Sequence, residues 1–199
     1  MKFSKISTIL LLLFSGVSLS AQDIFDMPTV VVTEGKDSQK GTYAYLERVA
    51  IIEIPDKNQT ELYESTINWL NETYINPDEV IKGKVENEYI RWTGTGGCLA
   101  FFDGLIGAVC YEMRYTIEVR FKEGRLRWEF IELEIYTPPS QYIKGGWSSW
   151  NGRFRVANYK GKYNKEISNG ASKYRSHMND IAKNYKEYLL KGNTADDDW

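Results

Sequence analysis

The chain has 199 residues and a formal net charge of −2, with 42% hydrophobic and 14% aromatic residues. This apolar content suits one globular domain with a packed core and excludes a disordered chain. The slightly acidic balance excludes the strongly basic surface of nucleic-acid-binding proteins, so we expect no nucleic-acid partner.

The first 21 residues have the pattern of a secretory signal peptide. Lys2 and Lys5 give a positive start, residues 9–14 form a short apolar core, and Ala21 is one of the small residues that suit a cleavage site. The apolar run is too short to span a bilayer, and we expect no transmembrane segment in the mature chain. The sequence therefore predicts residues 1–21 as a signal peptide and a periplasmic or secreted protein.

The chain that follows begins with a polar stretch that has no sustained period. We expect residues 22–41 to be a flexible N-terminal arm and residues 42–192 to form a single α+β domain. Residues 49–54 are rich in β-branched side chains and precede Pro55, which predicts a buried strand.

A helix is predicted after this strand. Asn58 and Glu61 have the spacing of a capping box at its start, and Pro77 ends it. Its apolar face is predicted from residues at steps of four, three and four: Tyr63, Ile67, Leu70 and Tyr74.

Two weaker segments come next. Residues 86–93 form a predicted strand whose poor alternation indicates an edge position. Residues 94–110 are Gly-rich and apolar, which favours a hairpin packed over the core. The alternative is a phosphate-binding loop, although no Lys, Ser or Thr stands at the spacing of a P-loop.

The chain has two cysteines, Cys98 and Cys110, on either side of this hairpin's turn. A three-residue loop centred on Gly104 would place them directly across from each other, whereas a two-residue loop would misalign them by one residue. We predict a disulfide because the protein is expected to be exported. The alternative is a pair of buried free thiols, and a metal site is not expected because the chain has a single histidine.

Residues 111–136 are predicted to form two long antiparallel strands that organise the fold. Apolar and charged residues alternate along the first strand, which gives it one apolar face. Glu123 and Gly124 form the turn, and the parity changes between Phe130 and Ile131, which predicts a β-bulge there. The apolar residues fall opposite one another in three pairs: Phe121 with Leu126, Val119 with Trp128, and Ile117 with Phe130.

The last third of the chain combines a predicted loop and a long helix. Residues 138–167 form a loop rich in aromatic and basic residues, within which residues 153–156 have the pattern of a short strand. Residues 168–191 are predicted to form the C-terminal helix, and residues 193–199 an acidic tail. The apolar face of the helix, which we expect to cover the sheet, contains Tyr174, Met178, Ile181, Tyr185 and Leu189.

The order of predicted elements is strand, helix, four strands, helix. Several short motifs accompany this order: Ile51-Ile52-Glu53-Ile54-Pro55, Trp69-Leu70, Pro77 with Val80-Ile81, Tyr115-Thr116-Ile117-Glu118-Val119, and Gly124-Arg125-Leu126-Arg127. The order and the motifs resemble a family of exported bacterial domains of unknown function with a TATA-binding-protein-like (TBP-like) fold. The resemblance covers residues 46–137 and implies an α+β fold with an antiparallel sheet covered by two helices. It brings no catalytic residues to this chain.

The aromatic and basic loop is the main candidate for a binding site. Five of its residues are predicted to contact a ligand: Tyr142, Trp147, Trp150, Arg153 and Arg155. Aromatic rings stack on sugars or apolar groups, and arginine binds carboxylate or phosphate, so the expected partner is an envelope glycan, lipid or protein. The alternative is that Trp147 and Trp150 fill the end of the core while the basic residues stay in solvent.

Two functions remain open at this point. The favoured one is a non-enzymatic binding or accessory module of the cell envelope, with no cofactor. The other is an envelope-directed hydrolase that uses His177, which has Asp180 three residues later, or the carboxylates of Glu129, Glu132 and Glu134. A histidine on a helix surface and carboxylates on a solvated strand face explain these residues more simply.

Overall fold

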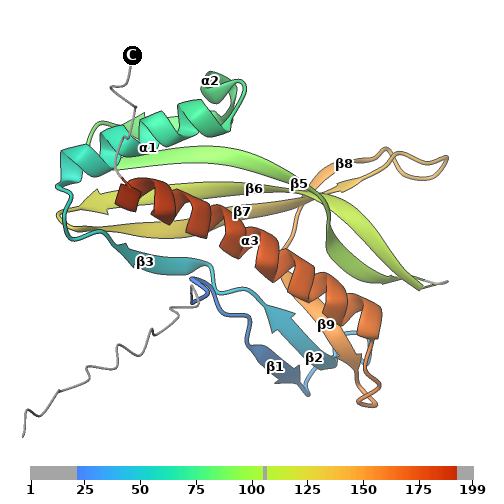
Figure 1. Ribbon diagram of the computed structural model, residues 1–199. Coiled ribbons are helices and arrows are strands. Elements are labelled where there is room, and N and C mark those ends of the chain that lie inside the picture. Colours follow the sequence, from blue (N-terminus) through green and yellow to red (C-terminus); the bar gives the residue numbers. More distant parts are fainter. Residues whose placement is uncertain (1–21, 105–106, 192–199) are drawn as a thin grey trace, which may run out of the picture.

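The computed structural model describes residues 22–104 and 107–191. The predicted signal peptide and the predicted acidic tail lie outside these ranges. Within the described ranges the chain forms two antiparallel sheets and two long helices (Figure 1). No helix in these ranges is long and apolar enough to cross a membrane.

The strands are β1 (Thr29–Val32), β2 (Gly41–Tyr45), β3 (Val49–Glu53), β4 (Ile81–Val85), β5 (Tyr89–Gly104), β6 (Gly107–Lys122), β7 (Arg125–Thr137), β8 (Gly146–Ser149) and β9 (Arg153–Asn158). The helices are α1 (Gln59–Thr73), α2 (Pro77–Val80) and α3 (Lys165–Lys191).

The larger sheet has six strands. β3, β7, β6, β5 and β4 lie side by side in that order, and β8 pairs with the far end of β7. From β3 the chain runs through α1 to β4–β7 and then to α3, with β1, β2, α2, β8 and β9 as additions. This is the predicted order of strand, helix, four strands, helix, so the α+β fold class is confirmed.

The central hairpin of β6 and β7 has the predicted register. Its pairs are Phe121 with Leu126, Val119 with Trp128, and Ile117 with Phe130. Next along β6, Thr116 faces Glu132, so Ile131 is an extra residue and the predicted β-bulge is confirmed. Gly124 in the turn has a φ of +68°, which a residue with a Cβ rarely adopts.

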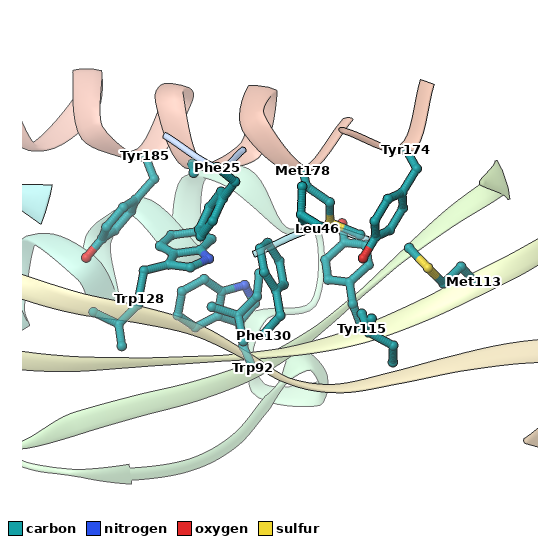
Figure 2. Packing of buried hydrophobic residues seen from close by; sticks show 14 of the residues in the cluster. Phe25, Leu46, Trp92, Met113, Tyr115, Trp128, Phe130, Tyr174, Met178 and Tyr185 are labelled. Atoms are coloured by element: carbon teal, nitrogen blue, oxygen red, sulfur yellow. The ribbon is translucent and has the colours of Figure 1, made fainter. Parts of the chain in front are cut away.

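α3 covers one face of the large sheet with a long apolar stripe. Tyr174, Met178, Tyr185 and Leu189 are fully buried, as predicted. In Figure 2, Met178 and Tyr185 point from the helix toward the side chains of the sheet, and the Tyr185 ring lies 5.1 Å from the ring of Trp128. The stripe and the apolar face of the sheet therefore form one core.

α1 begins with the predicted capping box. The Asn58 side chain accepts a hydrogen bond from the Glu61 N–H, and the Glu61 carboxylate accepts one from the Asn58 N–H. The buried face is rotated from the predicted one and contains Leu62, Thr66, Trp69 and Leu70. Thr66 is buried because its hydroxyl donates to the Leu62 carbonyl and lies 2.6 Å from the Tyr185 hydroxyl.

Two strands lie in positions other than those predicted. β3, predicted as a buried strand, is an edge strand that pairs only with β7 among the described strands and leaves Val49 and Ile51 exposed. Of residues 86–93, predicted as an edge strand, residues 86–88 form the turn after β4 and residues 89–93 begin β5, which lies between β6 and β4. The apolar composition of the two segments did not reveal how many neighbours each strand has.

The N-terminal segment is not the flexible arm predicted for residues 22–41. β1 pairs with β2, and β2 pairs with β9, so this segment contributes to a second, three-stranded sheet. Phe25 is 1% exposed, and its ring lies 5.1 Å from the ring of Phe130. The segment thus belongs to the core.

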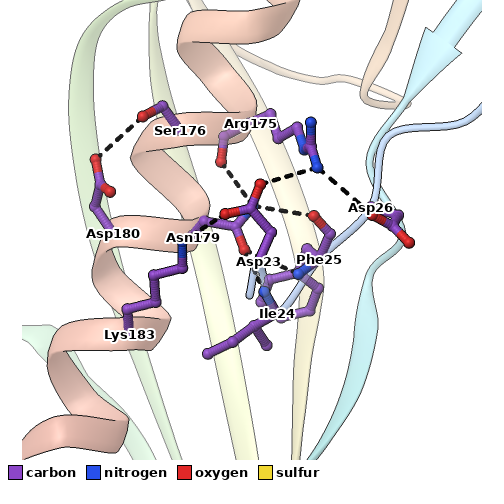
Figure 3. Close-up of polar contacts among 9 residues, drawn as sticks. All are labelled: Asp23, Ile24, Phe25, Asp26, Arg175, Ser176, Asn179, Asp180 and Lys183. Carbon is purple, nitrogen blue, oxygen red and sulfur yellow. Dashed lines mark hydrogen bonds and ion pairs between the residues drawn. The ribbon is translucent and has the colours of Figure 1, made fainter. Parts of the chain in front are cut away.

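Asn179 of α3 holds the backbone of this segment (Figure 3). Its side-chain oxygen accepts hydrogen bonds from the N–H groups of Ile24 and Phe25 at 2.7 and 2.9 Å, and its amide nitrogen donates to the Phe25 carbonyl at 3.0 Å. Asp23 forms ion pairs with the same helix, and the hydrogen bond from Lys183 lowers the pKa of the Asp23 carboxyl. A polar side chain therefore replaces the strand partner that this backbone lacks.

The predicted loop at residues 138–167 also contains regular structure. β8 and β9 lie within it, and α3 begins at Lys165 rather than at residue 168. β9 includes the short strand predicted at residues 153–156 and joins the second sheet. In Figure 1 this sheet lies beside the N-terminal half of α3.

Candidate functional site

A pocket of about 790 Å³ opens between the second sheet, the C-terminal half of β5 and the start of α3. We call it the arginine pocket. Its volume is in the range of roughly 300–1,000 Å³ that small-molecule sites occupy. It is lined by Tyr43, Arg48, Phe101, Phe102, Ser149, Trp150, Asn151, Arg153, Arg155 and Ile167.

β9 supplies two of the three arginines because its side chains alternate between two faces. Phe154 and Val156 are buried in the core, so Arg153 and Arg155 lie on the other face of the strand. β9 pairs with β2 so that Arg155 is opposite Tyr43, and residues directly opposite share a face. The pairing of these two strands therefore brings two guanidinium groups and a phenol to one side of the sheet.

Trp150 forms part of the pocket floor. It is 7% exposed, and its ring lies 5.9 Å from Phe102, 5.1 Å from Phe154 and 5.6 Å from Tyr174. The backbone N–H of Trp150 donates a hydrogen bond to the Leu133 carbonyl of β7. Trp150 thus fills the end of the core, as in the alternative raised from the sequence, while it also lines the pocket.

Two of the arginines have no partner for their charge among the described residues. No carboxylate lies within ion-pair distance of Arg48 or Arg153, and neither guanidinium group makes a hydrogen bond within those residues. Arg155 donates to the carbonyl oxygens of Asp37 and Lys40 at 3.2 and 2.7 Å, which orients its positive charge without neutralising it. Among the side chains that the structure describes, no acidic residue lines the arginine pocket, so the local potential of these residues is positive.

The other two predicted ligand contacts lie outside this pocket. Trp147 is on β8, where its ring packs 5.4 Å from the ring of Tyr136 and lies under the guanidinium of Arg114 at 4.5 Å. Tyr142 lies in the loop between β7 and β8 and is 87% exposed. The structure therefore brings together Trp150, Arg153 and Arg155 of the five predicted residues.

Sequence reasoning missed the rest of the lining. Tyr43 and Arg48 lie between the predicted arm and the first predicted strand, where no element was assigned, and Phe101 and Phe102 come from the Gly-rich hairpin. Glu47 directly precedes Arg48, so the sequence gives no signal that marks Arg48 as an arginine without a partner. These residues meet the others only because the second sheet forms, and that sheet was not predicted.

The disulfide between Cys98 and Cys110 is present, as predicted, with 5.1 Å between the two Cα atoms. The geometric reason differs from the predicted one. Cys110 is opposite Phe101, and Cys98 lies within a register shift of β5 with a φ of +54°. The bond cross-links β6 to β5, the strand that carries Phe101 and Phe102, so it restrains one wall of the arginine pocket.

His177, a candidate for the alternative hydrolase function, lies in a separate hollow of about 280 Å³ beside Gly96. Its Nε2 is 3.3 Å from the Tyr115 hydroxyl, and burial lowers the pKa of the imidazole. The hydroxyl of Ser176 donates to Asp180 at 3.4 Å, so these neighbours bond to each other rather than to the imidazole. A contact between a buried phenol and a histidine does not form a catalytic triad.

The other hydrolase candidates lie on the face of β7 that points away from the helices. Glu129 is paired with Arg127, and Glu134 is paired with Arg114 at 2.7 Å. Glu132 is exposed. These pairs fit the explanation of a charged, solvated strand face. Within the described ranges no group of three or more potential ligands could hold a metal ion.

Comparison with models of protein families gave no match, and comparison with curated proteins gave none either. Among solved structures, the chain is similar to a TBP-like protein from Parabacteroides distasonis, with a TM-score of 0.49 and 11% identity over 73% of this chain and 92% of that one. It is also similar to a DUF4468 family protein from Bacteroides ovatus, with a TM-score of 0.42 and 18% identity over 78% of this chain and 90% of that one. These are domains of the kind that the sequence motifs resemble. Neither name states a ligand or a reaction, so the function is argued below from the pocket.

Proposed function

We propose that this protein is an exported, non-enzymatic binding module of the bacterial cell envelope that holds an anionic ligand in the arginine pocket. The observation that carries the proposal is the placement of Arg48 and Arg153. Both line a pocket with an aromatic floor, and neither has a partner for its charge among the described residues.

Other arginines of this protein, unlike Arg48 and Arg153, form ion pairs within the part of the chain that the structure describes. Four arginines on the large sheet pair with carboxylates: Arg91 and Arg120 with Glu118, Arg114 with Glu134, and Arg127 with Glu129. A protein of net charge −2 has enough carboxylates to neutralise the pocket as well. An unneutralised pair of arginines over aromatic rings is what recognition of a carboxylate or phosphate requires, because the guanidinium group binds both in a bidentate manner.

The lining of the pocket also supports binding without catalysis. The described residues of this lining contain no carboxylate, imidazole or thiol. General acid–base and nucleophilic catalysis normally depend on such groups within hydrogen-bond distance of the substrate. An anion in this pocket would meet guanidinium, amide and hydroxyl groups, which orient a ligand and leave its bonds intact.

Export is supported by the pattern of residues 1–21, which lie outside the described ranges, and by the cysteines. A disulfide persists in oxidising compartments such as the periplasm or the extracellular space. The Cys98–Cys110 bond is therefore consistent with the proposed location.

The proposal is tested by a double substitution, Arg48→Ala with Arg153→Ala. The matched control is Arg125→Ala, because Arg125 also has no ion pair among the described residues but lies at the tip of the central hairpin, outside the pocket. The readout is retention on immobilised lipopolysaccharide and on immobilised polygalacturonate, with the unfolding midpoint measured alongside.

We expect the wild type and the control to be retained and the double variant to be lost. Each hydrogen-bonded contact to an anion contributes about 1.5–3 kcal/mol, so removing two arginines should weaken binding by roughly a hundredfold or more. Equal retention of the double variant, or no retention of the wild type on either matrix, would refute the proposal.

A further inference from the structure

The arginine pocket continues into two neighbouring pockets. One, of about 500 Å³ at the end of β2, shares Arg48, Asn151 and Arg153 with it. The other, of about 700 Å³ at the start of α3, shares Arg155 with it. The three pockets therefore adjoin one another along the second sheet, and we call them together the groove.

The same kinds of side chain recur along the groove. Each of its three pockets is lined by at least one tyrosine, one asparagine and one cationic residue. The tyrosines, taken from the end of β2 to the start of α3, are Tyr45, Tyr43, Tyr159 and Tyr163. Tyr159 and Tyr163 are 50% and 59% exposed, so their rings are open to a ligand. A repeated lining suits a ligand with repeated units.

Cationic side chains outnumber acidic ones in the groove. Among the side chains that the structure describes, the cationic residues are Arg48, Arg153, Arg155, Lys162 and Lys165, and the acidic residues are Asp37, Glu47 and Glu166. Asp37 forms an ion pair with Lys40 at 3.2 Å, and Glu166 accepts a hydrogen bond from the Ala108 N–H at 3.0 Å. Two of these three carboxylates thus already bind a partner within the protein. The excess of cationic side chains attracts anions along the groove.

Resting on the proposed function, we infer that the ligand is an acidic oligosaccharide, a chain of sugar rings that bear carboxylates, which lies along the groove across all three pockets. Tyrosine rings pack against the apolar faces of sugars, asparagine amides bond to sugar hydroxyls, and guanidinium and ammonium groups pair with carboxylates. The broad apolar floor is confined to the arginine pocket, so the groove has no continuous apolar track for an acyl chain.

The test is calorimetric titration of the mature chain with galacturonate oligomers of two, four and six units at constant ionic strength. We expect affinity to rise with length, by about tenfold or more from two units to six, because longer chains reach more of the groove. A neutral gluco-oligosaccharide of six units and polyglutamate of equal charge serve as controls for the sugar and for the charge. Both controls should bind at least tenfold more weakly than the hexamer.

Substitutions of tyrosines test which pocket is responsible for the increase in affinity with oligomer length. Tyr159→Ala with Tyr163→Ala removes the exposed rings of the pocket next to α3, and Tyr142→Ala removes an exposed tyrosine outside the groove. The double variant should bind the six-unit oligomer as weakly as the two-unit one, with the two-unit affinity unchanged, and Tyr142→Ala should bind as wild type. If the double variant is unstable, Tyr159→Ala alone should lose part of the gain with length.

The outcomes separate this inference from the proposed function. If the affinity for galacturonate does not change with oligomer length, the ligand does not lie along the groove. The same holds if the increase in affinity with length persists after both tyrosines are replaced. Either result leaves the arginine pocket as an anion site. Polyglutamate binding as tightly as the hexamer overturns the sugar specificity. Absence of binding to every anion overturns both proposals.

Discussion

Replacement of Asn179 by alanine should release the N-terminal segment from α3. Asn179 is 1% exposed, and its side chain provides three hydrogen bonds to the backbone of Ile24 and Phe25 and a fourth to the carbonyl of Arg175. Alanine would leave two buried N–H groups and one carbonyl of the segment without a partner.

The magnitudes decide how the protein responds. An orphaned buried polar group costs about 1–3 kcal/mol, so keeping the segment docked would cost about 3–9 kcal/mol. Releasing it exposes Phe25, which costs about 2–3 kcal/mol of apolar burial, and loses the ion pairs of Asp23, worth about 0–1 kcal/mol. Release therefore costs less free energy than keeping the segment docked. The released backbone also gains conformational entropy, which limits the net loss of unfolding free energy to about 2–3 kcal/mol.

The assay combines guanidinium denaturation with hydrogen exchange at the amides of residues 24 and 25. The matched control is Asn184→Ala on the same helix, because Asn184 is exposed and accepts a single hydrogen bond from the Trp69 indole at 3.0 Å. The control should lose only about 0.5–1.5 kcal/mol and should keep both amides protected. An Asn179→Ala variant no less stable than the control, with both amides still protected, would show that this docking is not what holds the segment.

Three further predictions follow from the fold and the proposed location. The mature protein in the periplasmic or secreted fraction should begin at Gln22, after cleavage at Ala21, and a mass that retains Met1 there would contradict export. Replacing Cys98 and Cys110 by serine should cost about 2–3 kcal/mol and should weaken ligand binding, since the bond fixes a pocket wall, so unchanged binding would remove that role. Met178→Asp would bury an unpaired charge at a fully buried site and should cost about 3–5 kcal/mol, and an unaltered melting temperature would mean that α3 does not cover the sheet.

Local patterns in the sequence were enough to predict the central hairpin and the start of α1, whereas α1 ends at Thr73 and Pro77 begins α2 instead of ending α1. The register of β6 and β7 follows from the alternation of residues such as Val119 and Trp128 and from the parity change at Ile131. The capping box at Asn58 depends on a spacing of three residues. Such features involve residues close in sequence, or strands joined by a tight turn, so the pattern specifies the contact.

The second sheet could not be predicted in this way. β2 and β9 pair residues more than a hundred positions apart, with Tyr43 opposite Arg155, and the short β2 has no strong alternation. The docking of Phe25 depends on a buried polar residue, Asn179, which occurs in a helix stripe otherwise identified by apolar residues. The arginine pocket was predicted only where the segment with Trp150, Arg153 and Arg155 contributes to it, because its other wall depends on this distant pairing.

The disulfide shows that a correct prediction can rest on incorrect geometry. Cys98 and Cys110 were expected to face each other across a three-residue loop, but the register of β5 and β6 places Phe101 opposite Cys110. A register shift between Gly96 and Ala100 brings Cys98 back within reach. An irregularity of this kind has no signature in the period of the sequence.

The central claim is that an anion binds between Arg48 and Arg153 over the Trp150 ring. Nuclear magnetic resonance titration with digalacturonate tests it directly, because side-chain signals report where the ligand lies. We expect saturable shifts of the Arg48 and Arg153 Nε–H signals and of the Trp150 indole N–H, with the Trp147 indole unchanged because its ring packs on β7, outside the pocket. Shifts confined to other residues, or no saturable shift at these three side chains, would contradict the account.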